Sequence, residues 1–340
     1  MTPSKVWEER IATVQEFLAT KIKSKTIANK LAEQIVYSAA DGLELQDDDF
    51  DTWFKQRFTQ QLVWLSSDDY ATSLARALWL APHFAGTDFG TSRQRDIGQA
   101  WTDTARGFMG EAAVSKFLFE HFKMEIPAVT RRGKAKEFIS TDIEKLKLPD
   151  GHEITPKLTA SIKTGKFNSR WLDAGGQFEH SDIFIAVKVG VARTHFISFL
   201  KDISFFKDKL FPKAVSLQAL SEAEAKTLWD EVPIMQPIPA YIPGYINKTD
   251  VHLPIDTLYC KIKGKKNKKI SVTQAVGVIT LADLRSNPKI QALDPTGTLP
   301  IEIEPMIGQL GERDTHFLAH CGGLRWGKQN WEAFVKSLIG

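Results

Sequence analysis

The chain has 340 residues, more than the commonest size of a single domain, so we expect two or three domains. Its hydrophobic content of 43% and charged content of 25% are typical of a soluble globular protein, and two cysteines are too few for a disulfide framework. The net charge of +3 does not by itself indicate a nucleic-acid partner.

No stretch of the sequence is long and apolar enough to be a membrane span, and residues 1–10 lack the apolar segment of a signal peptide. We therefore expect no membrane contact. Together with the low cysteine count, this favours a cytoplasmic location.

Residues 1–95 are predicted to form a helical N-terminal region. Apolar residues recur at helical spacing near 6–18 and 27–36, and again from Leu62 to Leu80. The acidic run at 47–51 is typical of a helix start, because carboxylates interact favourably with the positive end of a helix.

Residues 96–210 are predicted to form a mixed α/β domain. The segment 182–189 is almost continuously apolar, as expected of a strand buried on both faces. The order of helix, strands, short helix and strands indicates a mixed sheet. The predicted elements are a helix near 104–123 and strands near 136–143, 157–164, 182–190 and 194–200.

Residues 211–340 are predicted to form a linker and a smaller α+β region. The prolines of residues 211–255 indicate an irregular connection with one short helix near 222–229. The predicted later elements are strands near 256–263 and 270–281 and a final helix after Asn330. The whole chain is thus expected to be α/β (α+β overall), with a mixed-sheet core between a helical N-terminal region and a C-terminal α+β region.

Glu111 stands on the apolar face of the helix predicted near 104–123. Val114 and Leu118 follow it at three and seven residues, so the three side chains share one face. Burial of a lone carboxylate is unfavourable unless the group is paired, binds a metal or has a function. The alternative is a salt-bridged or half-exposed glutamate.

Asp142 closes the strand predicted near 136–143. There it either projects from the edge of the sheet or is an ordinary turn residue.

Ser161 and Lys163 lie in the strand predicted near 157–164. Alternation places them on one face and the apolar residues Ala160 and Ile162 on the other. A lysine in this position can stabilise the negative charge of a phosphoryl transition state. The alternative is an edge-strand lysine that faces solvent. Lys188, within the apolar segment 182–189, needs a partner, for which Asp142 or Glu111 would serve.

The order of these pieces resembles the PD-(D/E)xK nuclease superfamily, in its restriction-endonuclease and Holliday-junction-resolvase branches. The matching residues are Gly-Phe-Met-Gly-Glu ending at Glu111, then Asp142, then Ser-Ile-Lys ending at Lys163, within residues 104–200. The resemblance implies a restriction-endonuclease-like core whose catalytic residues are Glu111, Asp142, Ser161 and Lys163.

Two residues depart from the superfamily pattern. Thr141 stands where proline is common, and Ser161 stands where an aspartate or glutamate is usual. Some restriction enzymes of this superfamily carry such a serine, and a glutamate from elsewhere then completes the metal site. Glu111 is the preferred supplier here, and Glu179 is the second candidate.

The resemblance implies phosphodiester hydrolysis assisted by Mg²⁺, which prefers oxygen ligands. Glu111 and Asp142 are the expected metal ligands, and Lys163 is expected to contact the attacking water and the phosphate. This interpretation requires the two carboxylates and the lysine to meet around one cation, and side chains that point to opposite faces of the sheet would contradict it.

Basic residues near this core are predicted to contact DNA. Residues 130–171 hold ten lysines and arginines but five acids, and phosphates take most protein contacts to DNA. The alternative for each basic loop is a solvated surface. The predicted DNA-binding residues are Arg131, Arg132, Lys134, Lys166, Arg170 and Arg325, the last as a reader of a guanine edge.

The leading interpretation is a Mg²⁺-dependent type II restriction endonuclease that cuts double-stranded DNA at a specific sequence. A homodimer is expected, because two-fold DNA sites match two-fold proteins. A methyltransferase that acts on the same DNA site would be a functional partner and not a stable one. Two alternatives stay open: a repair or junction-directed nuclease on the same core, and a non-catalytic DNA-binding regulator.

Overall fold

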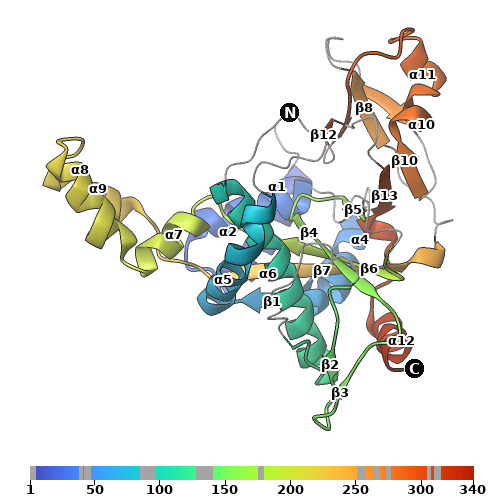
Figure 1. The fold of residues 1–340 in the computed structure, drawn as a ribbon, viewed down its shortest axis with the longest axis horizontal. Helices are drawn as coiled ribbons and strands as arrows, with labels where there is room; N and C mark the ends of the chain where they lie inside the picture. The colour runs from blue at the N-terminus through green and yellow to red at the C-terminus, as the bar shows by residue number, and fades with distance from the viewer. Residues whose placement is uncertain are drawn as a thin grey trace.

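The computed structural model describes residues 5–37, 41, 47–84, 97–127, 141–174, 180–250, 258–262, 269–272, 277–304, 308–309 and 315–340. These residues form a mixed α/β protein in which helices surround a four-stranded sheet (Figure 1). The expectation of a mixed α/β chain is therefore confirmed. None of the helices in these ranges combines the length and the apolar character needed to span a bilayer.

The central sheet has the strand order β1-β7-β6-β4. The strands β4 (Ala160–Lys166) and β6 (Ile183–Val189) are parallel. The long strand β7 (Ile238–Asn247) runs antiparallel to β6 and to β1 (Leu62–Leu65). Every residue of β6 is buried, as its continuous apolar sequence predicted.

One face of the central sheet is covered by two long helices, α5 (Ser67–Phe84) and α6 (Ile97–Phe122), which pack against each other. Val114 of α6 and Ile162 of β4 belong to the same buried core. The C-terminal helix α12 (Lys328–Ile339) contributes to this core as well.

The other face of the central sheet packs against a second sheet with the strand order β10-β13-β5. Phe184 and Ala186 of β6 share a buried core with Trp171 and Leu318 of that sheet. The strands of the second sheet are β5 (Trp171–Asp173), β10 (Gly277–Thr280) and β13 (Thr315–His320).

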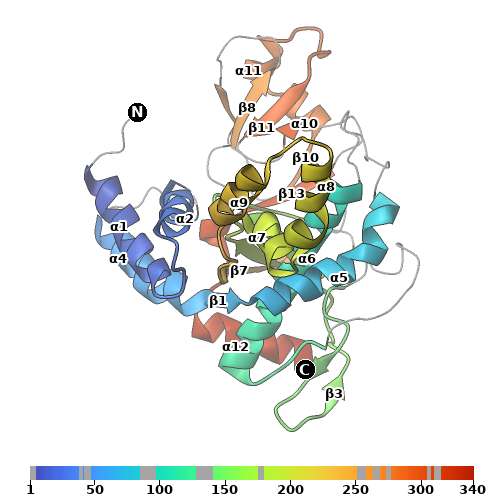
Figure 2. The same ribbon diagram turned by 90° about the vertical axis from the view of Figure 1, so that its left-hand side faces the viewer.

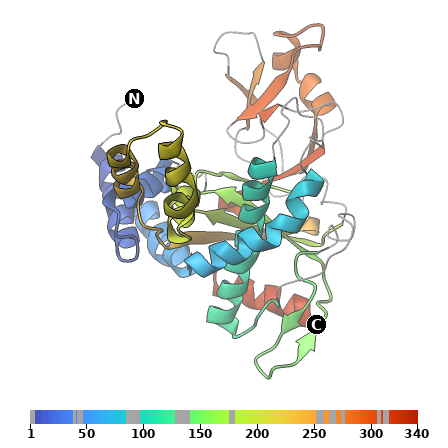
Figure 3. The same ribbon diagram turned by 60° about the vertical axis from the view of Figure 1, so that its left-hand side comes forward.

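A third sheet, with the order β12-β11-β8-β9, and two short helices form most of the orange lobe in Figures 1 and 3. A small separate hairpin precedes β4 and contains β2 (Leu146–Lys147) and β3 (Glu153–Ile154). The elements of the lobe are β8 (Leu258–Ile262), β9 (Lys269–Val272), α10 (Leu281–Arg285), α11 (Pro288–Gln291), β11 (Ile301–Glu304) and β12 (Gly308–Gln309).

The N-terminal helices form a third core, rich in aromatic rings, against the central sheet. The rings of Phe54 and Phe58 are stacked with centroids 5.8 Å apart, and Tyr241 of β7 lies 5.0 Å from Phe58. The elements here are α1 (Lys5–Ala19), α2 (Lys25–Tyr37), α4 (Asp47–Thr52), the π-helix η1 (Trp53–Phe58) and the 3₁₀ turn η2 (Thr59–Gln61).

Residues 195–232 form a helical arm that projects from the body, to the left in Figure 1 and toward the viewer in Figure 2. At its base, the ring of Phe199 lies 5.5 Å from that of Tyr70 on α5. The helices of the arm are α7 (His195–Asp202), the π-helix η5 (Phe206–Leu210), α8 (Phe211–Ser216) and α9 (Glu222–Glu231).

Several predicted elements are confirmed, among them the helix near 104–123, the strands near 157–164 and 182–190 and the helix near 222–229. Other predictions of secondary structure are wrong. The segment 62–65 is the strand β1 and not part of a helix, because four residues are too few to show a period. The segment 194–200 is not a strand but lies largely in helix α7, whose buried residues His195 and Ser198 are spaced three apart.

The Pro-rich segment predicted as an irregular connection contains strand β7 instead. Pro243 lies where the register between β6 and β7 shifts, and a β-bulge is one of the places where a strand tolerates proline. Because β1 and β7 come from the regions predicted as 1–95 and 211–340, the central sheet extends beyond residues 96–210 on both sides.

A buried ion pair fastens the N-terminal region to the central sheet. Nζ of Lys188 on β6 lies 2.7 Å from Oδ1 of Asp41. The hydroxyl of Tyr241 and Nε1 of Trp53 donate to Oδ2 of the same carboxylate at 2.7 and 2.9 Å. The expected pairing of Lys188 with Asp142 or Glu111 is therefore wrong, because Asp41 occupies that role.

Burial acts to raise the pKa of Asp41, but the charges of Lys188 and Arg57 and the hydrogen bonds outweigh it and hold this pKa well below its usual range. Arg57 also donates to the carbonyls of Pro243 and Cys321, so the network joins three distant parts of the chain. An ion pair of this kind is strongly destabilising to break, since removal of one partner leaves a buried charge uncompensated.

We predict that Asp41→Asn lowers the free energy of unfolding by about 3–5 kcal/mol at neutral pH, because Lys188 and Arg57 lose their counter-charge. Urea denaturation would measure this, with Asp150→Asn, an exposed carboxylate, as the matched control. The depressed pKa of Asp41 contributes stability that is lost as pH falls. The difference in free energy of unfolding between wild type and Asp41→Asn should therefore become smaller below pH 3.8. A small difference in this free energy at pH 7, or one that grows as pH falls, would contradict this account.

Candidate active site

Asp142 lies beside the outer edge of strand β4 and is held there by hydrogen bonds. Its backbone N–H donates to the carbonyl of Ala160 at 2.8 Å. Its Oδ2 accepts from the backbone N–H of Ile162 at 2.6 Å and from the hydroxyl of Ser161 at 3.3 Å. The carboxylate is thus fixed by the strand that carries Lys163.

Burial raises the pKa of Asp142, and the N–H of Ile162 and the charge of Lys163 oppose the rise. Asp142 thus lies beside a sheet edge, but the predicted strand is wrong where it can be checked, because residues 141–143 are not a strand. Residues 136–140 of that prediction lie outside the described residues.

Glu111 is held on α6 by an arginine that the sequence prediction did not include. Nη2 of Arg76 on α5 donates to Oε2 of Glu111 at 2.8 Å, and both side chains are about four-fifths buried. The guanidinium of Arg76 also lies 4.0 Å above the ring of Phe108. Burial raises the pKa of Glu111 to about 7; Arg76 opposes this rise, and the charge of Asp142 adds to it.

Glu111 and Asp142 line one cavity of about 300 Å³ between α5, α6 and the edge of the sheet. Two cations line it as well, Arg76 and Lys116, and Lys116 forms a 2.6 Å ion pair with Asp69 at the same cavity. A polar hollow with charges of both signs suits an anionic ligand accompanied by a cation.

Ser161 and Lys163 face the opposite side of the sheet. Ala160 and Ile162 belong to the core under α6, and the hydroxyl of Thr164 reaches the carbonyl of Gly107 on α6 at 3.4 Å. The predicted alternation is therefore confirmed, and it directs Lys163 away from α6.

Lys163 lines a second hollow, of about 130 Å³, together with Asp173 and Lys188. Burial lowers the pKa of Lys163, and the negative charges of Asp142 and Asp173 oppose this shift. Asp173, on β5, is thus a second carboxylate near the lysine.

The expectation that Glu111, Asp142 and Lys163 meet around one cation on one side of the sheet is wrong. Glu111 and Lys163 lie on opposite faces of β4, because alternation along the strand sends Lys163 away from α6. Asp142 connects them, because its charge acts on both Glu111 and Lys163 from the edge of the strand. Within the described ranges, no three histidine, cysteine or carboxylate side chains converge as a ready-made set of metal ligands.

The carboxylate oxygens of Asp142 and Glu111 nevertheless fit Mg²⁺, which prefers oxygen ligands. Within the described part of the chain, hydrogen bonds reach Oδ2 of Asp142 and Oε2 of Glu111, and the second oxygen of each carboxylate is the atom that a cation would take. The charge of Asp142 raises the pKa of Glu111, and a divalent cation between the two carboxylates would relieve that repulsion.

Three of the predicted DNA-binding residues, Lys166, Arg170 and Arg325, lie within the described part of the chain. Lys166 is exposed at the end of β4, and Arg170 is half-buried before β5. Arg325 forms two hydrogen bonds of 2.8 Å with the carboxylate of Asp250, so its guanidinium is already engaged. Arg131, Arg132 and Lys134, and the alternative metal ligand Glu179, lie outside the described residues.

Arg76 and Asp173 are the site residues that sequence reasoning missed. Arg76 is a single cation in the apolar segment Leu-Ala-Arg-Ala-Leu of residues 74–78, which could have marked it as a paired charge on a buried helix. Asp173 ends a strand of three residues, and three residues are too few to show the alternation by which a strand is predicted.

Comparisons of the chain with models of protein families, with curated proteins and with solved structures gave no match. The function is therefore argued from the geometry of this site and from the resemblance of its residues to a nuclease pattern.

Proposed function

We propose that this protein is a Mg²⁺-dependent endonuclease of the restriction type, which hydrolyses phosphodiester bonds in double-stranded DNA. The observation that carries the proposal is the position of Asp142. Its buried carboxylate is fixed to the backbone of β4 and acts electrostatically on both Glu111 and Lys163. A helix glutamate, a strand-edge aspartate and a strand lysine in this order are the parts that the nuclease resemblance requires.

In this proposal Asp142 and Glu111 hold the cation in the 300 Å³ cavity that they share. When bound, Mg²⁺ supplies a water of lowered pKa and neutralises charge on the scissile phosphate. Lys163 approaches the same edge from the other face of β4. Its ammonium would stabilise negative charge on a phosphate placed beside Asp142.

Arg76 has two roles in this proposal. In the absence of a cation it neutralises Glu111 through the 2.8 Å ion pair. If a cation engaged Glu111, the guanidinium of Arg76 would stay at the wall of the cavity, where it could bind a phosphate oxygen with its fixed fork of donors.

The proposal extends to four further properties: sequence specificity, a homodimer, a cytoplasmic location and a methyltransferase that acts on the same DNA site. These properties rest on the resemblance to restriction enzymes, which cut both strands of DNA sites that have two-fold symmetry. A repair or junction-directed nuclease would use the same site and differ in its products.

One observation favours a second candidate function, a DNA-binding protein that does not cut. The Arg76–Glu111 ion pair occupies one expected metal ligand, and Lys163 lies on the other face of the sheet. Such a protein would bind DNA equally well with and without a divalent cation.

Incubation of the protein with plasmid and Mg²⁺ should give discrete fragments, and EDTA should prevent them. This outcome follows from a site in which a cation must neutralise the phosphate. Gel electrophoresis separates the candidates. A smear or junction-dependent cutting would favour the repair nuclease, and binding without cleavage would contradict the nuclease proposal.

We predict that Asp142→Asn and Lys163→Ala each reduce the cleavage rate by about 10²-fold or more while the fold is kept, since each removes charge at the phosphate. Asp150→Asn and Lys336→Ala, at exposed positions outside the site, are the matched controls and should cleave as wild type does. Full activity of Asp142→Asn would refute the assignment.

At pH 9, where Glu111 stays ionised without Arg76, Arg76→Ala should tighten Mg²⁺ binding about fivefold, because the cation no longer competes with an ion pair that contributes about 1 kcal/mol. Isothermal titration of Mg²⁺ into the DNA-free protein measures this. Arg106→Ala, which removes an arginine of α6 that pairs with Asp103, should leave the affinity unchanged. An unchanged affinity in Arg76→Ala would show that Glu111 is not a metal ligand.

A further inference from the structure

The helical arm of residues 195–232 is held together by its own contacts and is not needed to build the candidate active site. Nζ of Lys201 on α7 donates to the carbonyls of Trp229 and Val232 at 2.6 and 2.7 Å, which fastens the end of α9 to α7. Ser221 and Glu224 form a reciprocal capping box at the start of α9. The arm is therefore a well-defined helical unit on the surface.

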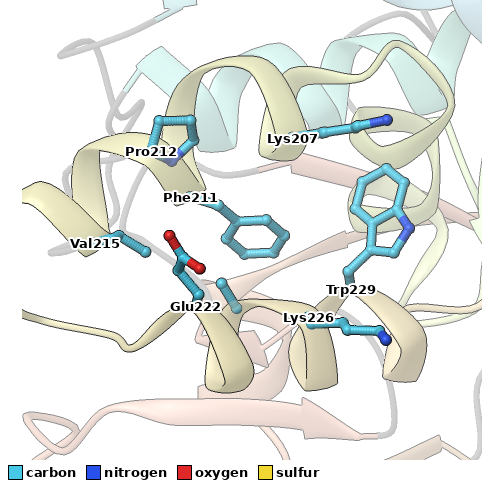
Figure 4. Close-up of a pocket in the computed structure, with 8 residues that line it drawn as sticks. Lys207, Phe211, Pro212, Val215, Glu222, Lys226 and Trp229 are labelled. Atoms are coloured by element: carbon cyan, nitrogen blue, oxygen red, sulfur yellow. The ribbon is translucent and has the colours of Figure 1, made fainter.

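An apolar hollow of about 440 Å³ opens between η5, α8 and α9 in the middle of this arm. Figure 4 shows the rings of Phe211 and Trp229 in its wall, with Pro212 and Val215 on one side. The charged side chains of Lys207, Glu222 and Lys226 surround this apolar interior.

Large apolar side chains are exposed along the same arm. Leu217, at the turn between α8 and α9, is 64% exposed, and Ile234, just beyond α9, is 70% exposed. The other exposed apolar side chains of the arm are Ile197, Ile203, Phe205, Leu210 and Leu228. Exposed apolar area concentrated on one projecting unit favours a contact with another macromolecule.

The charges of the arm are divided between its two halves. Residues 203–216 carry three lysines and one aspartate, and residues 221–232 carry four acids and one lysine. All of these side chains are exposed. The arm thus presents a basic half, which contains η5 and α8, beside an acidic half, which is α9.

We propose that the arm is a dimerisation surface whose partner is the arm of a second copy of this chain. A two-fold axis along the two arms sets the basic half of each copy against the acidic half of the other. The same operation places the exposed Leu217 of each copy against the apolar hollow of the other. A two-fold contact requires a surface that complements itself, and both the charges and the apolar groups of this arm meet that condition.

The charges also argue against DNA as the partner of this surface. The acidic α9, with Glu222, Asp230 and Glu231 exposed, would repel phosphates close to the hollow. The inference stands on the arm alone and holds whether or not the protein cleaves DNA.

Sedimentation velocity of the full chain at micromolar concentrations should give a particle of twice the 38.2 kDa of one chain. Leu217→Glu, which places a charge in the apolar contact, should shift the protein to the monomer. Leu78→Glu is the matched control, because Leu78 is similarly exposed, at 59%, but lies on α5. A monomeric wild type, or a Leu217→Glu variant that remains a dimer, would overturn the proposal.

A charge exchange tests the pairing itself. A chain with Lys209→Glu and Lys213→Glu has two acidic halves, and a chain with Glu222→Lys and Asp230→Lys has two basic halves. Each should be monomeric alone, and a mixture of the two should form heterodimers. Variants that each dimerise as wild type does, or a mixture that stays monomeric, would contradict the contact between basic and acidic halves.

Discussion

The hydrogen bond between the backbone N–H of Ile162 and the carboxylate of Asp142 is the interaction on which the candidate site depends. At 2.6 Å it ties an acidic side chain to the edge strand that carries Ser161 and Lys163. The backbone of β4 is itself fixed by its parallel pairing with the fully buried β6. A carboxylate attached to such a scaffold cannot move away from its buried environment, and burial there raises the pKa of Asp142. A cation that accompanies a phosphate would remove that cost.

The site is spread around the edge of β4 and is not gathered on one face. Alternation along the strand sends Thr164 toward α6 and Lys163 toward β5, so helix α6 and the lysine must approach Asp142 from opposite sides. Glu111 is neutralised by Arg76, and Lys163 lies near Asp173. Each expected catalytic group thus has a counter-charge of its own, and substrate or cation would replace these pairings rather than fill an uncompensated site.

Sequence patterns predicted the elements whose signals are long and regular. Helix α6, which contains Glu111, and strand β4, which contains Ser161 and Lys163, have clear apolar periods. Strand β6 is marked by its continuous apolar sequence. The strand β1 was missed because it has four residues, and β7 because its prolines suggest a loop. The partner of Lys188 could not be predicted, since Asp41 is 147 residues away and no local pattern connects them. Arg76 was missed for the same reason, because only the packing of α5 on α6 brings it to Glu111.

The most direct measurement is a crystal structure of the protein grown with Mn²⁺, in which anomalous scattering locates the ion. The account predicts a single strong peak about 2.0–2.6 Å from carboxylate oxygens of Asp142 and Glu111, with Arg76 displaced from Glu111. A map without a peak at Asp142, in which the Arg76–Glu111 pair is intact, would contradict a metal-dependent nuclease and leave a DNA-binding protein as the better description.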